Sequence, residues 1–90
     1  MNGKQLRYIR KACYLSQVSL AELLGMEVTA IARFENERQS PQLRTQRKLQ
    51  QVLKYDEIDL IEINELLEDK DADERRHARL KKKLREQANI

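Results

Sequence analysis

The sequence contains few Gly and Pro residues, which break helices, and few Cys and Trp residues, which cross-link a fold or fill its core. It has two Gly, one Pro, one Cys and no Trp in 90 residues. Strand-rich folds need more Gly and Pro for their turns, so this scarcity favours a helical chain. A lone cysteine cannot form an internal disulfide, which is typical of proteins in the reducing cytoplasm. We expect no signal peptide, because the N-terminal residues lead into no apolar core. We also expect no contact with a membrane, because no apolar run approaches the ~18 residues of a membrane span.

The sequence also lacks the patterns that hold metals or carry out catalysis. Cys13 and His77 are the only residues of their kinds and lie far apart, which argues against zinc. Residues 69–73 resemble the start of a calcium loop, but Glu74 and Leu80 occupy the positions that require Gly and Glu. Phosphate-loop, nucleophile-elbow and dinucleotide fingerprints are missing. We therefore expect no enzyme, no cofactor and no metal site.

The small net charge of +3 conceals three blocks of opposite sign. Residues 1–54 contain ten Lys/Arg and four acids, a surplus of +6. Residues 55–74 contain one Lys and ten acids, or −9, and residues 75–90 contain seven Lys/Arg and one Glu, again +6. Sorted charge of this kind indicates that different segments meet different partners.

Apolar spacing predicts a first helix over 4–13. Leu6, Ile9 and Cys13 recur at i, i+3 and i+7, which defines one face of a helix. The basic residues between them fall on other faces. Cys13 is therefore expected to be a small buried apolar side chain without a redox role.

A second helix is predicted between a capping serine and a glycine. Ser16 can accept from the free backbone N–H groups of the first turn. Leu20, Ala21 and Leu24 are the inward positions, and Gly25 suits a helix end that requires positive φ.

Two further helices are predicted before residue 54. In residues 28–36, Ile31 and Phe34 lie at i and i+3 and are expected to point inward. Ser40 and Pro41 favour the start of a fourth helix, with Ser as N-cap and Pro at the first helical position. The apolar residues of this fourth helix are Leu43, Leu49, Val52 and Leu53.

The acidic block is compatible with a helix that buries a stripe of Leu60, Ile63 and Leu67. Residues 55–63 could instead form a short extended arm, but the abundance of Glu and Leu in the second half favours helix. A last helix is predicted after Asp71 or Asp73 as its cap, with acids in its first turn and bases toward its end. Its narrow apolar stripe consists of Ala78, Leu80, Leu84 and Ala88.

Two short helices joined by a tight Gly turn in a basic segment form a helix-turn-helix pattern. Its distinctive residues are Leu15-Ser16-Gln17, Leu20-Ala21-Glu22-Leu23-Leu24-Gly25-Met26, Ile31, and Phe34-Glu35-Asn36 through Pro41. The sequence over roughly 4–54 resembles the Xre/Cro/lambda-repressor-like DNA-binding family. The resemblance implies an all-α fold, a five-helix domain that is dimeric on DNA, with residues 28–36 as the recognition helix. The remaining residues would form a C-terminal helical extension.

A recognition helix meets the major groove with its N-terminal part, so its first exposed side chains contact the bases. Glu27 can accept from cytosine N4, and Val28 or Ala30 can pack on a thymine methyl group. Thr29 can bond either a base or a phosphate. Arg33, one turn later, is the strongest candidate for a bidentate guanine contact or a phosphate contact.

The resemblance also implies roles for residues outside the recognition helix. Gln17, at the start of the second helix, is expected to touch the DNA backbone. Asn36 and Arg38, in the loop after the recognition helix, are likewise expected to hold phosphates. Arg10 and Glu35 match the internal ion pair of the family.

The sequence departs from the family pattern at three places. Tyr14 and Glu37 occupy positions that often carry Gly, so each either tolerates strain or reshapes a turn. Glu27 and Val28 replace the Ser/Thr and Gln/Arg common at the head of the recognition helix. These changes affect the expected operator sequence more than the expected fold.

We predict two parts with different tasks. Residues 1–54 form the DNA-binding domain of a small dimeric repressor that occupies a palindromic site. Residues 55–90 form an acidic, then basic, helical extension for self-association. The alternative is an antitoxin-like or antirepressor-partnered regulator whose extension binds another protein. The basic residues after 74 could be a solvated face, a second DNA contact or a partner for the acidic block; the charge sequence favours an antiparallel hairpin with the acidic block.

Overall fold

The computed structural model describes all 90 residues as six α-helices without strands. The predicted all-α class is thereby confirmed. Residues 1–54 contain four helices and not the expected five, and the predicted extension over 55–90 contains the other two. The helices are α1 (Gly3–Ala12), α2 (Gln17–Leu24), α3 (Val28–Glu35), α4 (Leu43–Leu53), α5 (Glu57–Glu68) and α6 (Glu74–Ala88). None of them is both long and apolar enough to cross a membrane.

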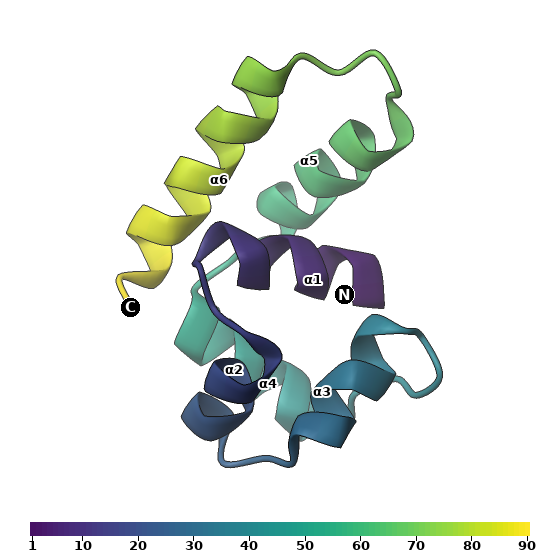
Figure 1. Cartoon of the computed structure of the whole chain (residues 1–90), viewed down its shortest axis with the longest axis vertical. Coiled ribbons are helices and arrows are strands. Elements are labelled where there is room, and N and C mark those ends of the chain that lie inside the picture. The colour runs from purple at the N-terminus through teal and green to yellow at the C-terminus, as the bar shows by residue number, and fades with distance from the viewer.

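Helices α2 and α3 form the helix-turn-helix at one end of the molecule, while α5 and α6 lie at the opposite end (Figure 1). The Ser16 hydroxyl accepts from the Ser19 backbone N–H at 3.0 Å, as expected of an N-cap. Gly25 ends α2 in the left-handed region at φ 64° and ψ 38°. Local capping therefore sets both ends of α2 as the sequence predicts.

The fourth helix begins later than predicted. Its N-cap is Gln42 and its first residue is Leu43, so Ser40 and Pro41 lie in the preceding loop. The Pro41 carbonyl instead accepts from the Gln46 side chain at 3.0 Å, which ties the loop to the second turn of α4. Leu43 was expected to face the core but is exposed, because the tertiary contact of α4 is made by its C-terminal half.

The acidic segment is a helix rather than an extended arm. Asp56 caps α5 through a reciprocal capping box with Asp59, in which each carboxylate accepts from the other residue's backbone N–H. The buried face consists of Leu60, Ile63 and Leu66. The expected third position, Leu67, is exposed because the helix turns the 59/63/66 side toward the core.

Asp73, and not Asp71, is the N-cap of α6, where its carboxylate accepts from the Arg75 backbone N–H at 2.9 Å. Leu80, Leu84 and Ala88 form the buried stripe as predicted. Ala78 is exposed, because two residues along a helix from Leu80 correspond to a rotation of about 200°.

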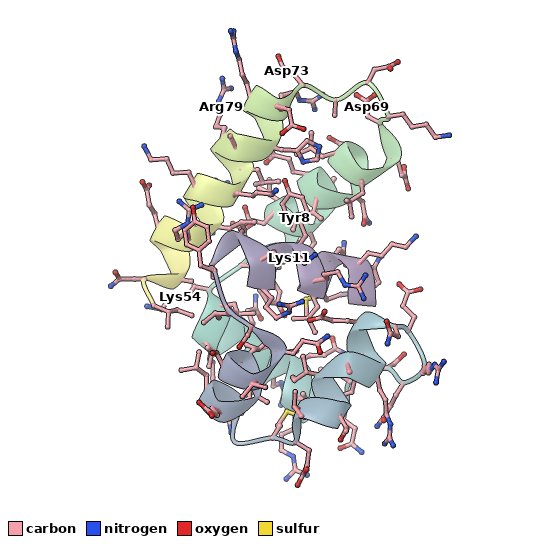
Figure 2. The ribbon with its side chains drawn as sticks, in the orientation of Figure 1. Tyr8, Lys11, Lys54, Asp69, Asp73 and Arg79 are labelled. Carbon is pink, nitrogen blue, oxygen red and sulfur yellow. The ribbon has the colours of Figure 1, made fainter.

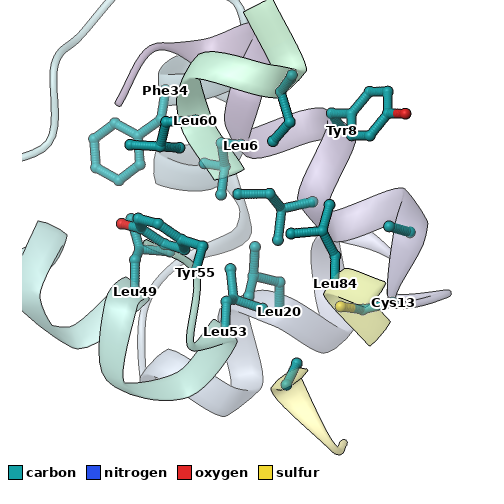
Figure 3. Packing of buried hydrophobic residues seen from close by; sticks show 14 of the residues in the cluster. Leu6, Tyr8, Cys13, Leu20, Phe34, Leu49, Leu53, Tyr55, Leu60 and Leu84 are labelled. Carbon is teal, nitrogen blue, oxygen red and sulfur yellow. The ribbon is translucent and has the colours of Figure 1, made fainter. Parts of the chain in front are cut away.

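The buried apolar side chains form one continuous cluster of 19 residues that draws on all six helices (Figure 3). Tyr55 in the α4–α5 link, Ile63 of α5 and Leu84 of α6 belong to this cluster together with Leu6 and Leu20. Helix α6 packs against α1, α4 and α5. Residues 55–90 are therefore joined to residues 1–54 through a shared core.

Helices α5 and α6 run antiparallel and are linked by two ion pairs, one toward each end of the hairpin (Figure 1). The Lys83 ammonium donates to the buried Asp59 carboxylate at 3.0 Å, and Arg76 lies 3.5 Å from Asp69. Burial alone would raise the pKa of Asp59, but hydrogen bonds from Gln87, Asp56 and Lys83 hold it below its usual value. The blocks of opposite charge thus meet within one chain at these two places.

Glu37 has a backbone conformation that a side chain disfavours, with φ 59°. We expect Glu37→Gly to raise the free energy of unfolding by about 0.5–1 kcal/mol, because Gly relieves roughly 1–2 kcal/mol of left-handed strain and returns part of it as chain entropy. Urea unfolding measures the change. The matched control is Gly25→Ala, at φ 64°, which should destabilise by a similar amount. A destabilised Glu37→Gly chain would contradict the strain argument.

Candidate nucleic-acid interface

The predicted base-contacting residues lie at the head of α3. Glu27 is the N-cap residue, but its side chain makes no capping hydrogen bond and is exposed. Val28 is 37% exposed at the first helical position, and Thr29 and Arg33 are exposed on the same helix. Ala30 is half-buried and packs against the core, so it offers the least surface of the five. Four of the five predicted side chains are therefore available to a ligand.

Arg33 carries an uncompensated charge. No carboxylate lies within 4.0 Å of its guanidinium group, whereas Arg7 and Arg10 are both paired with Glu35. Its backbone carbonyl accepts from the Arg38 N–H at 3.0 Å, which fixes the start of the following loop. An exposed arginine with all its donors free suits an anionic or base-edge acceptor.

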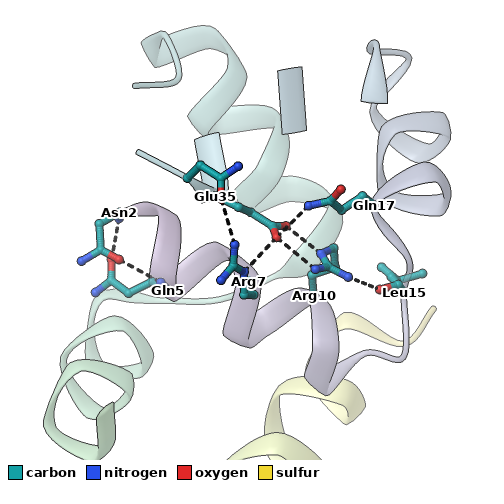
Figure 4. Close-up of polar contacts among 8 residues, drawn as sticks. Asn2, Gln5, Arg7, Arg10, Leu15, Gln17 and Glu35 are labelled. Atoms are coloured by element: carbon teal, nitrogen blue, oxygen red, sulfur yellow. Dashed lines mark hydrogen bonds and ion pairs between the residues drawn. The ribbon is translucent and has the colours of Figure 1, made fainter. Parts of the chain in front are cut away.

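Glu35, at the C-terminal end of α3, is the centre of a buried polar cluster (Figure 4). Arg10 donates from Nε to Glu35 Oε2 at 2.6 Å and from Nη2 to Oε1 at 3.0 Å. Arg10 also donates from Nη1 to the Leu15 carbonyl at 2.8 Å. The bidentate pair therefore locks α3 to α1 and to the turn that precedes α2.

Gln17 and Arg7 complete the cluster around the same carboxylate. The Gln17 Nε2 and Arg7 Nε groups donate to Glu35 Oε1 at 3.2 and 3.3 Å. Arg7 also donates from Nη2 to Asn36 Oδ1 at 3.2 Å. One side-chain amide hydrogen of Gln17 is thus bonded inside the protein. Only its second amide hydrogen remains for the predicted contact with the DNA backbone. Sequence reasoning missed Arg7, although it precedes Arg10 by three residues on α1.

The environment of Glu35 keeps its carboxylate ionised. Burial on its own would raise the pKa of Glu35. The hydrogen bonds from Arg10, Gln17 and Arg7, together with the charge of Arg10, outweigh burial and hold this pKa below its ordinary value. The four side chains therefore form a charged, hydrogen-bonded cluster, the Glu35 cluster, that fixes the C-terminal end of α3 against α1 and α2.

The turns beside the Glu35 cluster contain Tyr14 and Glu37, the two residues at positions where the family resemblance predicts Gly. Tyr14 follows α1 at φ 57°, and Glu37 follows α3 at φ 59°, so both residues adopt the left-handed conformation without being Gly. The Glu37 N–H donates to the Phe34 carbonyl at 3.2 Å. Asn36 and Arg38, the predicted phosphate contacts, are exposed on either side of it. The expected turn geometry is thus retained at a cost in backbone strain.

Close packing of backbones positions α3 against α1. A Cβ placed on Gly3 would lie 2.3 Å from the Phe34 carbonyl oxygen and 2.5 Å from that of Glu35. The first residue of α1 can therefore approach the end of α3 only as glycine.

No group of three His, Cys, Asp or Glu side chains comes together as a possible metal site.

A family model described as Helix-turn-helix matches residues 6–60. The matched segment contains most of α1, all of α2, α3 and α4, and the first residues of α5, and it ends before α6. No curated protein and no solved structure matches the chain. The matched range extends six residues beyond the predicted boundary at 54 and includes every predicted DNA-contacting residue.

Proposed function

Since the chain belongs to the helix-turn-helix family of DNA-binding transcription regulators, we propose that it is a sequence-specific repressor that acts as a homodimer at a palindromic operator. The observation that carries this proposal is the N-terminal part of α3. It presents exposed side chains and Arg33, which has no ion pair, on a helix that the Glu35 cluster holds in place. Occupancy of a promoter by such a dimer would block transcription, and no catalytic step is part of the proposal. We place this activity in the cytoplasm, where the buried free thiol of Cys13 stays reduced.

Base recognition in this proposal falls to four exposed residues of the recognition helix and its cap. Arg33 donates to guanine, Thr29 bonds a base or a phosphate, and Val28 packs on a thymine methyl group. Glu27 accepts from a cytosine, which would also exclude sites that place a phosphate or another acceptor there. Gln17, Asn36 and Arg38 contact the backbone and fix the register of the helix in the groove.

Self-association is supported by apolar side chains on the outer side of α5. Ile58 and Ile61 are 68% and 57% exposed and lie at i and i+3, so they occupy neighbouring positions on one helix face. A second copy of the chain would cover them symmetrically. Light scattering of the full chain is expected to give the mass of a dimer, and a monomer mass at micromolar concentration would contradict this part of the proposal.

The alternative is an extension that binds another protein, and it predicts a different state of α6 in the free chain. A partner-binding extension of the antitoxin-like kind is expected to become ordered only with its partner. Here Leu80, Leu84 and Ala88 are already buried in the common core of the chain. This packing supports the repressor proposal over the alternative.

Selection of bound sites from random duplex DNA tests the proposal directly. We expect an enriched motif with two inverted half-sites about one helical turn, ~10 bp, apart, because each protomer presents one recognition helix. The half-sites should contain a guanine opposite Arg33. Selection without an enriched motif would contradict sequence-specific binding, and a single half-site would contradict the symmetric dimer.

A further inference from the structure

We propose that the groove between α1 and α6 is a second binding surface for the sugar–phosphate backbone of nucleic acid, continuous with the contacts of the helix-turn-helix. The groove has a volume of about 480 Å³, and four cations line it: Lys11, Lys81, Lys82 and Arg85. Glu74 is the only carboxylate in its lining. This inference rests on the proposed function and adds to it a contact made by α6, which lies outside the matched family segment.

The cations of this groove have almost no internal partners. Lys11, Lys81 and Arg85 have no carboxylate within 4.0 Å, and Lys82 has only Glu86 at the limit of 4.0 Å within its own helix. By contrast, Lys83 on the other side of the helix is engaged with buried Asp59. The positive charge facing α1 is therefore available to an external anion.

Aromatic rings and a backbone carbonyl hold two of these cations in place. The Arg85 guanidinium lies 4.2 Å from the centre of the Tyr14 ring and donates from Nε to the Ala12 carbonyl at 2.9 Å. Lys81 lies 5.5 Å from the centre of the Tyr8 ring. Cations fixed by cation–π contacts lose less side-chain entropy when an anion binds. Arg85 is half-buried and donates inside the protein only from Nε, so its Nη groups remain for an external acceptor.

The groove connects to the predicted DNA-contacting edge through the outer face of α1. A neighbouring groove of about 340 Å³ between α1 and α5 is lined by Lys4, Arg7 and Lys11, so Lys11 belongs to both. Arg7 in turn donates to Asn36, one of the predicted phosphate contacts. Figure 2 shows Lys11 and Tyr8 on the same stretch of α1, beside α6. A basic track thus runs from Asn36 along α1 to α6.

The chemistry of the lining favours nucleic acid over an acidic protein. Two of the eight lining residues of the α1–α6 groove are hydrophobic, whereas protein–protein interfaces have an apolar centre and are depleted in lysine. Backbone phosphates, in contrast, are neutralised by rows of Lys and Arg without regard to sequence.

The test uses the full chain with Lys11→Gln and Lys81→Gln together, which removes one charge from each wall of the groove. The probe is a labelled random-sequence duplex of about 40 bp, followed by fluorescence anisotropy over a salt series. We expect the slope of log affinity against log salt to become less steep by about 1.8, since each phosphate contact contributes about 0.9. At 0.1 M salt the affinity should fall about tenfold or more.

The matched control is Lys70→Gln with Arg79→Gln, which also removes two charges, from exposed side chains that line neither groove. Arg79 points away from α1 (Figure 2), so this variant should keep the slope of the unchanged chain. Circular dichroism should show the same helix content for both variants. An unchanged slope for the groove variant, or an equal loss in the control, would overturn the proposal.

Two comparisons separate this inference from the proposed function and from a protein partner. Specific binding to a selected operator without any effect of the groove variant would overturn the groove alone. Groove-dependent binding to random duplex without an enriched motif would overturn the sequence-specific repressor while supporting the groove. Groove-dependent binding of a poly-glutamate peptide more tightly than the duplex would overturn the choice of nucleic acid as the partner.

Discussion

Glu35→Ala is expected to lower the free energy of unfolding by about 3–5 kcal/mol, the cost of breaking a buried ion pair by removing one partner. The substitution removes the acceptor of four hydrogen bonds and leaves the buried guanidinium of Arg10 without a counter-charge. Arg7 and Gln17 lose their fixed positions at the same time. Because the cluster joins α1, α2 and α3, we expect the helix-turn-helix itself to loosen.

Thermal unfolding followed by circular dichroism measures this effect. A loss of 3 kcal/mol should lower Tm by at least about 12 °C in a chain of this size. Glu22→Ala, an exposed glutamate of α2 without an ion pair, is the matched control and should change stability by no more than about 0.5 kcal/mol. Equal melting temperatures for the two variants would show that the cluster does not hold the fold.

The same cluster makes the protein sensitive to acid. The pKa of Glu35 in the folded chain lies below its ordinary value, as does that of Asp59, so the folded state binds fewer protons than the unfolded state. Their contribution to stability is complete above the ordinary carboxyl range of about pH 4 and is lost as the pH falls through the lowered pKa values. Glu35→Gln should therefore be less stable at pH 7 and lose less stability than the unchanged chain between pH 6 and pH 3.

Arg33→Ala is expected to weaken binding to the selected operator by about 1–3 kcal/mol, or roughly 5- to 150-fold, if the guanidinium makes a bidentate base contact. Arg33 is exposed and has no ion pair, so its removal should leave stability nearly unchanged. The loss would therefore come from binding and not from folding. Selection with the variant should also relax the preference at one position of each half-site.

Fluorescence anisotropy with the operator duplex and with a point-substituted duplex measures both effects. Arg79→Ala is the control, because it also removes an exposed arginine, from α6 on the side that faces away from α1. A uniform loss over all sequences would assign Arg33 to a phosphate contact instead of a base. Full operator affinity in the Arg33→Ala chain would contradict the placement of α3 in the groove.

Local signals in the sequence were enough to locate most of the helices. Ser16 and Gly25 delimit α2 because capping and positive φ depend on neighbouring residues only. The start of α4 was predicted wrongly for the same reason. Ser40 and Pro41 are favourable local helix starters, yet the helix begins two residues later with Gln42 as its N-cap, and α4 reaches the core only at Leu49 and Leu53.

Apolar periodicity identified which helices have a buried face but not always its direction. Leu67 and Ala78 satisfied the expected stripes and are exposed, while Leu66 was left out of the stripe and is buried. In α5 the apolar residues are so numerous that more than one set of them can form a continuous apolar face. Only packing against α1 and α6 selects which of these stripes faces the core.

The sequence by itself determined the all-helical class, the family, the start of α3 and the three blocks of charge. These properties depend on residue type and short-range spacing, which a single chain displays directly. The tertiary structure decided that Arg7 joins the cluster around Glu35, that α6 shares the core of the domain, and that Lys11 and Lys81 line one groove. Such contacts join residues up to 73 positions apart, and their geometry exists only after the helices have packed.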